Sequence, residues 1–486
     1  MVRIRTRIHD KFSLEFKIWY DNKEKHTPAA IEGNSGVKPL LFRQECWIFV
    51  PAALDINALT YSREQFYSDI TTYYRAITPV YTLRELATGG GPRMDPDTRT
   101  PLGFLSNAIH NLADYPTEAN IAEYEYQIKM YCAIFKSAVR ERYTLVKLGE
   151  DTIESFREDL LAGLTGYGSL RESLKGRIED KLYDYYAFGE EFIINLAQMY
   201  THKIYANVGK GKDFIAYLAL YKQERGYSAL QLDSEYDNAN LLYRWNVLKK
   251  YVESDLFLSA DKRRSGVLKE QVYYSIAAGL SMIFATAVTF TFQQKYGNFT
   301  MPLFVALVVS YMLKDRIKEL VRSAFASNRK LRYFDNKTLL WVKDTLIGRS
   351  REGFDFIPQS KVPSHILDIR NRSTIVDVEN RMNQESVLFY RTLVELDKVR
   401  LDSTSEYEID GINKIFLFNF SSFIKKMDNP KVNYPLYKSD GEIVPVTVKK
   451  IYYVNFIFQF TCNGEVINCR YRIMMNREGI LNLEEL

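Results

Sequence analysis

The sequence has little cysteine and little tryptophan, with four residues of each type among 486. The cysteines form no C-x-x-C pair and no zinc-ligand spacing, which argues against a structural zinc site and is typical of a reducing compartment. Their positions are Cys46, Cys132, Cys462 and Cys469. The first ten residues alternate charged and apolar side chains and contain no apolar run, so we expect no cleavable signal peptide.

Signatures of catalysis and cofactor binding are lacking as well. The sequence contains no H-E-x-x-H, no EF-hand loop and no G-x-G-x-x-G. Gly209–Lys212 lacks the first glycine and the Ser or Thr of a phosphate loop, and Gly348–Gly353 has one residue too many for G-x-S-x-G. Glu190 and Glu191 share a predicted helix with His202, and Glu191 lies on the same face as His202, but at a spacing too long for metal ligands. We interpret them as solvated or paired within their helix, and we expect no metal and no cofactor.

One long apolar run is present. Val272–Phe292 has 21 residues without a charge, and as a helix it would span about 31 Å, enough for a hydrocarbon core. After a short polar stretch comes a second run, Phe299–Leu313, which would span only about 22 Å. Starting at Tyr296 and letting Lys314 snorkel would extend it to about a full crossing. The sequence therefore predicts a transmembrane helical hairpin over 272–313; a buried core hairpin of a soluble protein is the alternative.

Basic residues concentrate on both sides of this hairpin. Residues 261–271 and 314–332 hold eleven Lys and Arg against four Asp and Glu, whereas the connecting stretch has one cation, Lys295. The positive-inside rule therefore predicts an integral protein of a plasma or inner membrane with both termini in the cytoplasm. Attraction to anionic lipid head groups is a second interpretation. The juxtamembrane basic residues are Lys262, Arg263, Arg264, Lys269, Lys314, Arg316, Lys318 and Arg322.

Small side chains recur every four residues in both apolar runs. Because lipid gives helices little hydrophobic reason to associate, close approach across small residues supplies the contact instead. The stripe closes the hairpin within one chain or joins chains in a homo-oligomer; chance recurrence of small residues is the alternative. The predicted packing residues are Ala277, Ser281, Ala285, Thr289, Ala306 and Ser310.

Strand and helix patterns alternate along the rest of the chain. Strict apolar alternation over 12–20 and the apolar stretch 42–51 indicate strands, whereas apolar residues three and four apart from residue 117 onward indicate helices. Asn463-Gly464 suits a type I′ turn and predicts a hairpin in which Phe460 faces Ile467 and Phe458 faces Cys469. The same register pairs Phe456 with Tyr471 and Val454 with Ile473.

We therefore predict an α+β membrane-anchored protein. Its two-helix transmembrane hairpin lies between a cytoplasmic β-then-helical N-terminal region and a β-rich C-terminal domain. The expected divisions are an N-terminal β-rich region over 1–115 with a loop at 87–101, a helical bundle over 116–258, a basic juxtamembrane linker over 259–271, the hairpin over 272–313, a cytoplasmic helix extension over 314–347, a linker over 348–364 and an antiparallel β-rich C-terminal domain over 365–486.

An anchor without recognisable chemistry indicates a two-pass membrane-anchored cytoplasmic scaffold or adaptor that binds a protein partner at the lipid bilayer. The net charge of +5 gives no reason to expect nucleic acid. A membrane-tethered enzyme with a site built from scattered residues stays open, and converging acidic or histidine side chains in a pocket would favour it. An oligomeric pore or effector subunit also stays open. Its polar material would be uncharged: Ser275, Ser281, Thr286, Thr289 and Thr291.

Overall fold

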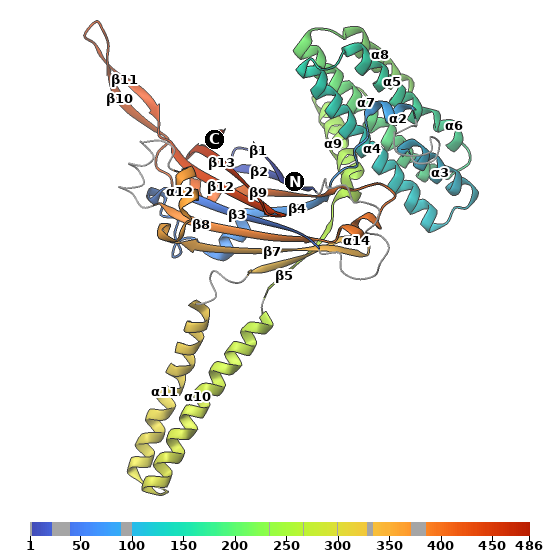
Figure 1. Cartoon of the computed structure of the whole chain (residues 1–486). Helices are drawn as coiled ribbons and strands as arrows, with labels where there is room; N and C mark the ends of the chain where they lie inside the picture. Colours follow the sequence, from blue (N-terminus) through green and yellow to red (C-terminus); the bar gives the residue numbers. More distant parts are fainter. Residues whose placement is uncertain are drawn as a thin grey trace. The chain divides into compact units, whose positions relative to one another are not determined.

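The computed structural model describes residues 2–21, 39–88, 100–232, 234–265, 267–298, 300–327, 334–370 and 385–486. The loop expected at 87–101 lies almost wholly outside these ranges. The chain forms two compact units (Figure 1). The β unit comprises Met1–Tyr74, Ser259–Thr404 and Gly411–Leu486, and the helical unit comprises Arg75–Leu258 and Ser405–Asp410. The chain is thus a mixed α+β protein with a β-rich C-terminal region.

Two sheets build the β unit. The smaller has the order β1 (Val2–Ile8), β2 (Ser13–Asp21), β9 (Gly411–Asn419), β4 (Ile70–Ala76). The larger is antiparallel throughout, with the order β14 (Gly479–Glu485), β13 (Glu465–Asn476), β12 (Tyr452–Cys462), β3 (Leu40–Val50), β8 (Ser386–Leu396), β7 (Thr345–Ile357), β6 (Asn336–Val342), β5 (Ser259–Arg264). Strands far apart in the sequence are therefore neighbours in space.

Aromatic rings fill the space between the two sheets. The ring of Phe16 on β2 lies 5.3 Å from that of Phe456 and 5.1 Å from that of Phe458, both on β12. Tyr390 on β8 stacks on Phe416 of β9 at 5.6 Å. The alternation predicted over 12–20 is confirmed, because every second side chain of β2 is fully buried in this core. Large rings at these separations contribute both apolar burial and favourable edge and offset contacts.

The hairpin of β12 and β13 has the predicted register. Phe460 pairs with Ile467, Phe458 with Cys469, Phe456 with Tyr471 and Val454 with Ile473. The turn residues Asn463 and Gly464 both have positive φ, 49° and 85°. A type I′ turn requires this backbone conformation, which asparagine and glycine adopt at low cost.

The β regions at the two ends of the sequence form one unit rather than two domains. β3 lies between β8 and β12, so an N-terminal strand is hydrogen-bonded on both sides to C-terminal strands. Residues 348–364, for which the sequence predicts a linker, instead contain most of β7, and residues 259–271 contain β5. The sequence of β7 is polar because it contains Ser350 and Glu352, which are buried against partners inside the protein.

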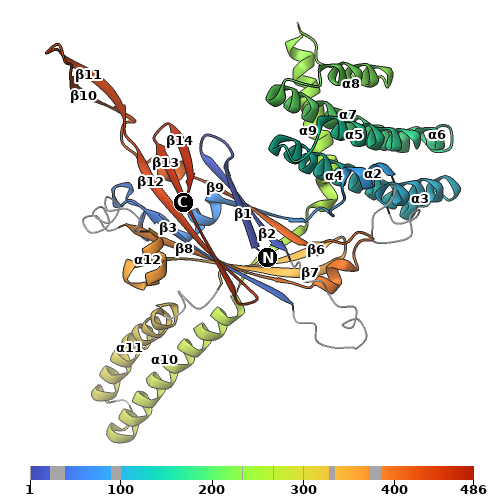
Figure 2. The ribbon, with the colours of Figure 1, turned by 45° about the horizontal axis from the view of Figure 1, so that its top comes forward.

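Helices packed side by side form the helical unit (Figure 2). The unit contains α2 (Leu83–Thr88), α3 (Pro101–Asp114), α4 (Glu118–Leu148), α5 (Ile153–Ser169), α6 (Arg171–Leu174), α7 (Asp180–Val208), α8 (Lys212–Glu224), α9 (Glu235–Glu253) and the turn η3 (Ser254–Leu256). The Thr117 hydroxyl accepts a hydrogen bond from the Asn120 backbone and begins α4, and Gly149 ends that helix at φ 77°. Residues 405–410 return from the β unit, and the Tyr407 hydroxyl donates to Gln127 at 2.6 Å.

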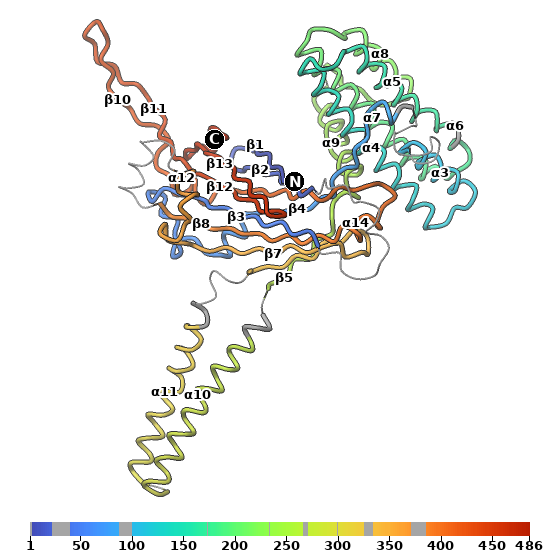
Figure 3. The backbone as a smooth tube through the Cα atoms, viewed as in Figure 1, coloured from blue at the N-terminus to red at the C-terminus, as the bar shows by residue number. Residues whose placement is uncertain are grey.

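A pair of long helices, α10 (Val267–Tyr296) and α11 (Met301–Ser327), runs side by side as a hairpin (Figure 3). Among the described residues, α10 is the one helix whose length and composition suit a membrane span, over Gln271–Tyr296. The second crossing stays a prediction, because the apolar part of α11 ends at Lys314. The remaining short elements are η2 (Ala52–Leu54), α1 (Arg63–Asp69), η4 (Gln359–Lys361), α12 (Ser364–Arg370), α14 (Lys398–Asp402), α15 (Ser421–Ile424), β10 (Lys431–Tyr437) and β11 (Ile443–Lys449).

Candidate functional site at the base of the helical hairpin

The helical hairpin takes the place of the turn between two paired strands. β5 precedes α10, β6 follows α11, and the two strands pair from Ser259 with Trp341 to Arg264 with Asn336. The backbone N–H of Ser265 continues this ladder and donates to the carbonyl of Asp335 at 2.7 Å. Both ends of the hairpin therefore connect to one edge of the large sheet.

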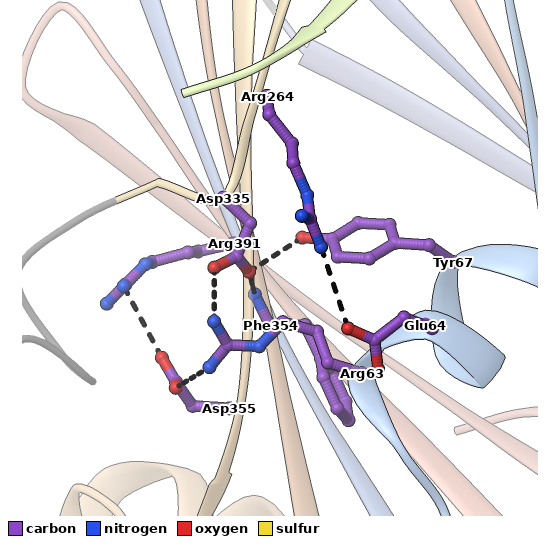
Figure 4. Close-up of polar contacts among 8 residues, drawn as sticks. All are labelled: Arg63, Glu64, Tyr67, Arg264, Asp335, Phe354, Asp355 and Arg391. Carbon is purple, nitrogen blue, oxygen red and sulfur yellow. Dashed lines mark hydrogen bonds and ion pairs between the residues drawn. The ribbon is translucent and has the colours of Figure 1, made fainter. Parts of the chain in front are cut away.

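Asp335 is the centre of the polar contacts at this base (Figure 4). Its carboxylate accepts hydrogen bonds from Arg63 Nη1 at 2.6 Å, from the Tyr67 hydroxyl at 2.9 Å and from the Phe354 backbone N–H at 2.8 Å. Arg63 and Tyr67 both come from α1, and the side chain of Ser62 caps the start of this helix. Burial and the nearby carboxylates raise the pKa of Tyr67, so the hydroxyl stays a donor. The short helix α1 is thereby joined to the residue that precedes β6.

Arg63 bridges two carboxylates of this cluster. Its second terminal nitrogen, Nη2, lies 3.0 Å from Asp355 Oδ1, and Arg391 approaches Asp355 Oδ2 at 3.4 Å (Figure 4). Beneath these polar groups, the ring of Phe66 stacks on that of Phe354 with centroids 3.7 Å apart. A planar guanidinium that serves two acceptors holds its neighbours in a defined geometry. Helix α1 is therefore fixed to β7 by charge and by ring stacking together.

Glu352 connects the hairpin base to the interior of the β unit. The carboxylate is buried, with Lys262 of β5 at 3.2 Å and Lys414 of β9 at 3.8 Å. Burial alone would raise the pKa of Glu352, but the two ammonium groups outweigh it and lower the pKa. Burial lowers the pKa of Lys414 to about 8, although Glu352 opposes this effect. One acidic side chain therefore joins the strand that enters the hairpin to a strand of the other sheet.

Further polar groups in the core surround this pair. The Lys414 ammonium donates to Thr392 at 2.8 Å and to the Tyr390 hydroxyl at 3.2 Å. The Tyr74 hydroxyl donates to Ser350 at 2.7 Å. A buried charge is tolerated only where such partners satisfy it, so this network specifies how the two sheets align.

The predicted packing stripe lies on the facing sides of α10 and α11. Ala277, Ser281, Ala306 and Ser310 are buried, and Ala285 is half-buried. The Ser310 hydroxyl donates to the backbone carbonyl of Ala285 at 3.3 Å. Thr289 is half-buried one turn further along α10. That these small side chains control the stability of the hairpin or of an oligomer stays a prediction.

The predicted juxtamembrane basic residues lie on three elements. On β5, Lys262 contacts Glu352, Arg263 pairs with Asp261 at 2.6 Å, and Arg264 lies 3.7 Å from Glu64 (Figure 4). On α11 lie Lys314, Arg316, Lys318 and Arg322. Lys269 lies in α10, and its side chain is outside the described residues.

The residues that form the centre of this site were not predicted from the sequence. Arg63, Asp335, Glu352 and Lys414 belong to no motif, and their partners are far away in the sequence. The available signal was the run of charged residues over 349–355, in a segment interpreted as a linker, 348–364. A strand with charged residues facing the core needs partners, but the sequence does not say which.

Glu190 and Glu191 are buried, so their interpretation as solvated or paired within one helix is wrong. Glu190 accepts a hydrogen bond from the Tyr227 hydroxyl at 2.8 Å and lies 3.2 Å from Arg225. Glu191 forms a bidentate ion pair with Arg244 of α9, and the shortest contact is 2.6 Å. The two carboxylates therefore tie α7 to the segments that follow it.

The polar side chains at the hairpin base join separate strands and helices through ion pairs and hydrogen bonds. Its carboxylates face guanidinium, ammonium, hydroxyl and backbone N–H groups. The part of the chain that the structure describes contains no cluster of three His, Cys, Asp or Glu suited to hold a metal ion. Comparison with protein-family models, with curated proteins and with solved structures finds no match for this chain.

Proposed function

We propose that the chain is a membrane-anchored cytoplasmic scaffold that holds a protein partner at a lipid bilayer. The observation that carries the proposal is the insertion of the helical hairpin between the paired strands β5 and β6. An anchor joined to one sheet at both ends holds the β unit to the membrane through two chain connections, and the Asp335 contacts fix the strand that follows the hairpin. Two membrane crossings with both termini in the cytoplasm belong to this proposal, supported by the basic residues on either side of the hairpin.

The partner surface that we propose is one face of the ribbon formed by β10 and β11 (Figure 3). Three apolar cross-strand pairs lie on that face: Val432 with Val448, Tyr434 with Val446 and Leu436 with Val444. Tyr434 is 62% exposed and Leu436 is 53% exposed. A two-stranded ribbon is marginally stable alone in water, and a contiguous exposed apolar surface is typical of an interaction site.

Two prolines decide how a partner can approach this ribbon. Hydrogen bonds from Lys450 N to Pro430 O and from Lys438 N to Glu442 O, both 2.9 Å, set the alternation of the ladder. In that alternation Pro435 and Pro445 oppose each other in a pair without mutual hydrogen bonds, so their nitrogens face the two outer edges. A proline nitrogen cannot donate, which blocks an added strand at the middle of each edge. The partner must therefore cover the apolar face.

The size of the face favours a partner protein over a second copy of this chain. Six side chains form it, whereas a stable interface uses roughly 20–30 residues on each side. Two ribbons pressed together would therefore not hold a dimer by themselves. We infer a protein with an apolar groove that receives the ribbon and makes further contacts around it.

The test compares substitutions on the two faces of the same rungs. Proteins retained by the full chain in mild detergent are identified, and the retained partner is purified and titrated against two variants. Tyr434→Ser/Val446→Ser removes the apolar face, and Asn433→Ser/Thr447→Ser changes the opposite face as a control. We expect at least a tenfold weaker Kd for the first variant and an unchanged Kd for the control, with all proteins remaining in the membrane fraction.

Three results would contradict this function. Equal affinity of both variants would show that the ribbon is not the partner surface. A loss of oligomer size on gel filtration in the apolar-face variant would assign the face to a second copy of the chain. Release of the wild-type protein from membranes by alkaline extraction would show that the hairpin does not anchor the chain in the bilayer.

A further inference from the structure

The two helices of the hairpin have a fixed antiparallel register. The Ser310 hydroxyl bonds to the Ala285 carbonyl at 3.3 Å, and the Arg322 guanidinium lies over the ring of Tyr274 at 4.3 Å. Each step toward the base on one helix therefore corresponds to one step on the other. In this register Lys314 lies level with Ser281, and Lys318 lies level with Ala277.

The apolar stretches of the two helices, aligned in this way, end at different levels. From the hairpin turn, α11 is free of charge from Met301 to Leu313, about 20 Å of helix. On α10 the uncharged stretch continues past Ser281 as far as Val272, about 13 Å further toward the base. Beside that additional stretch, α11 carries six charged residues: Lys314, Asp315, Arg316, Lys318, Glu319 and Arg322.

The magnitudes show which helix determines the depth of insertion. A Lys, Arg or Asp side chain at the centre of a membrane helix costs about 2.5–3.5 kcal/mol, whereas a Leu, Ile or Val there gains only about 0.3–0.6 kcal/mol. Six charges on α11 therefore outweigh the few large apolar side chains that α10 would bury at the same level. Snorkelling offers little relief, because side chains lean toward the helix N-terminus, which for α11 is the hairpin turn. The ammonium of Lys314 does so, lying 4.2 Å from the centre of the Tyr311 ring.

We propose that the membrane boundary crosses the hairpin at Ser281 and Lys314, and that the charged residues of α11 from Lys314 to Arg322 lie at the level of the anionic lipid head groups. Lys314, Lys318 and Arg322 are four apart and continue the side of α11 on which Ser310 contacts α10. Residues 272–280 of α10, apolar by composition, then lie in the head-group layer. This inference rests on the proposed membrane anchor. It also means that the shared apolar depth is about 10 Å less than an ordinary hydrocarbon core, so the bilayer thins around the hairpin.

A depth measurement with the full chain tests the boundary. A polarity-sensitive dye is attached to a single new cysteine at Ile276 or at Ala287, in a background with Cys462→Ser and Cys469→Ser, since Cys46 and Cys132 are buried. The protein is reconstituted into vesicles of phosphatidylcholine and phosphatidylserine, and aqueous iodide is added. We expect iodide to quench the dye at position 276 at least threefold more strongly than the dye at position 287.

The outcomes separate the depth from the anchor itself. Equal protection at both positions overturns the proposed boundary while leaving the anchor in place. Equal strong quenching at both positions would show that the hairpin is not in the membrane, which overturns the anchor and this inference together. Only unequal quenching, stronger at position 276, supports the boundary.

Substitution of the lysines tests their role in setting the depth. We expect Lys314→Leu/Lys318→Leu to reduce quenching at position 276 at least twofold, because two of the charges that hold this level in the head-group layer are gone. Lys431→Leu/Lys449→Leu removes the same charge from the exposed β10–β11 ribbon and should leave the quenching unchanged. Unchanged quenching in the Lys314→Leu/Lys318→Leu variant would overturn the role of these two residues.

Discussion

Arg63 and Asp335 lie 272 residues apart in the sequence, and their side chains meet at 2.6 Å at the base of the hairpin. Asp335 immediately precedes β6, the strand that the chain enters after the hairpin, and Arg63 begins α1. The pair therefore fixes the start of β6 to an element that is remote from it in the sequence. The Tyr67 hydroxyl and the Phe354 backbone N–H donate the other hydrogen bonds to the same carboxylate.

Asp335→Ala should weaken this connection. The substitution leaves the Tyr67 hydroxyl and the Phe354 N–H without their acceptor and removes one of the two carboxylates that Arg63 serves. We expect a loss of about 2 kcal/mol in the free energy of unfolding of the β unit, because three hydrogen bonds to one charged group are lost at a partly exposed site. Urea unfolding followed by tryptophan fluorescence measures it. Glu64→Ala, at an exposed carboxylate of the same cluster, should change stability little; equal losses would contradict the role of Asp335.

Lys414 should make the stability of the β unit depend on pH in the alkaline range. Burial lowers its pKa from 10.5 to about 8 in the folded protein. Between these two values the unfolded chain binds more protons than the folded protein, so this contribution to stability rises as the pH increases. The free energy of unfolding of the wild type minus that of Lys414→Met, measured by urea unfolding from pH 7 to pH 10.5, should therefore increase by at most about 3 kcal/mol. A flat or falling difference would contradict this assignment.

The stripe of small residues makes a prediction about the helical hairpin. Ala285→Leu places a larger side chain beside the carbonyl that Ser310 contacts, so we expect a thermal aggregation temperature several degrees lower in detergent. Ile283 is 66% exposed on another face of α10, and Ile283→Leu should have almost no effect. Equal behaviour of the two variants would remove the stripe as a packing surface. A smaller size on gel filtration for Ala285→Leu alone would place an oligomer contact there.

The cysteines should all be free thiols that differ in accessibility. Cys462 pairs with Glu465 and Cys469 with Phe458, four rungs apart, which is about 13 Å along the ladder and too far for a disulfide. Burial raises the pKa of both Cys46 and Cys132. A maleimide should therefore modify at most Cys462 and Cys469 in the native protein and all four after denaturation, as mass spectrometry of the labelled peptides would show. A Cys462–Cys469 bridge would show that the register is wrong.

Local patterns in the sequence predicted those parts of the fold whose partners are adjacent in the chain. The β12–β13 register followed from an Asn-Gly turn and strict alternation, because a two-residue turn leaves a single way to pair the flanking strands. β3 has equally clear apolar character, yet its neighbours β8 and β12 begin 346 and 412 residues after β3 begins. Apolar alternation indicates which face of a strand is buried but not which strand lies beside it.

The candidate site was beyond prediction for the same physical reason. The apolar run of α10 is a local property and was recognised, whereas the Glu352 contacts join β5, β7 and β9, which no local pattern relates. The polar character of β7 even favoured a linker there. Buried ion pairs carry opposite charges on separate segments, so each half looks like ordinary solvated surface until the fold brings them together.

The position of β3 between two late strands has a consequence for biosynthesis. At about 5–20 residues per second, a ribosome needs roughly 20–80 s to proceed from residue 50 to the end of β12. The helices of the hairpin are synthesised within that interval, so the anchor is ready for the membrane before the sheet that holds it is complete. Meanwhile both edges of the apolar segment Leu40–Val50 lack their native neighbours and can capture foreign strands. Productive maturation of this chain therefore depends on shielding a nascent strand for longer than most small domains take to fold.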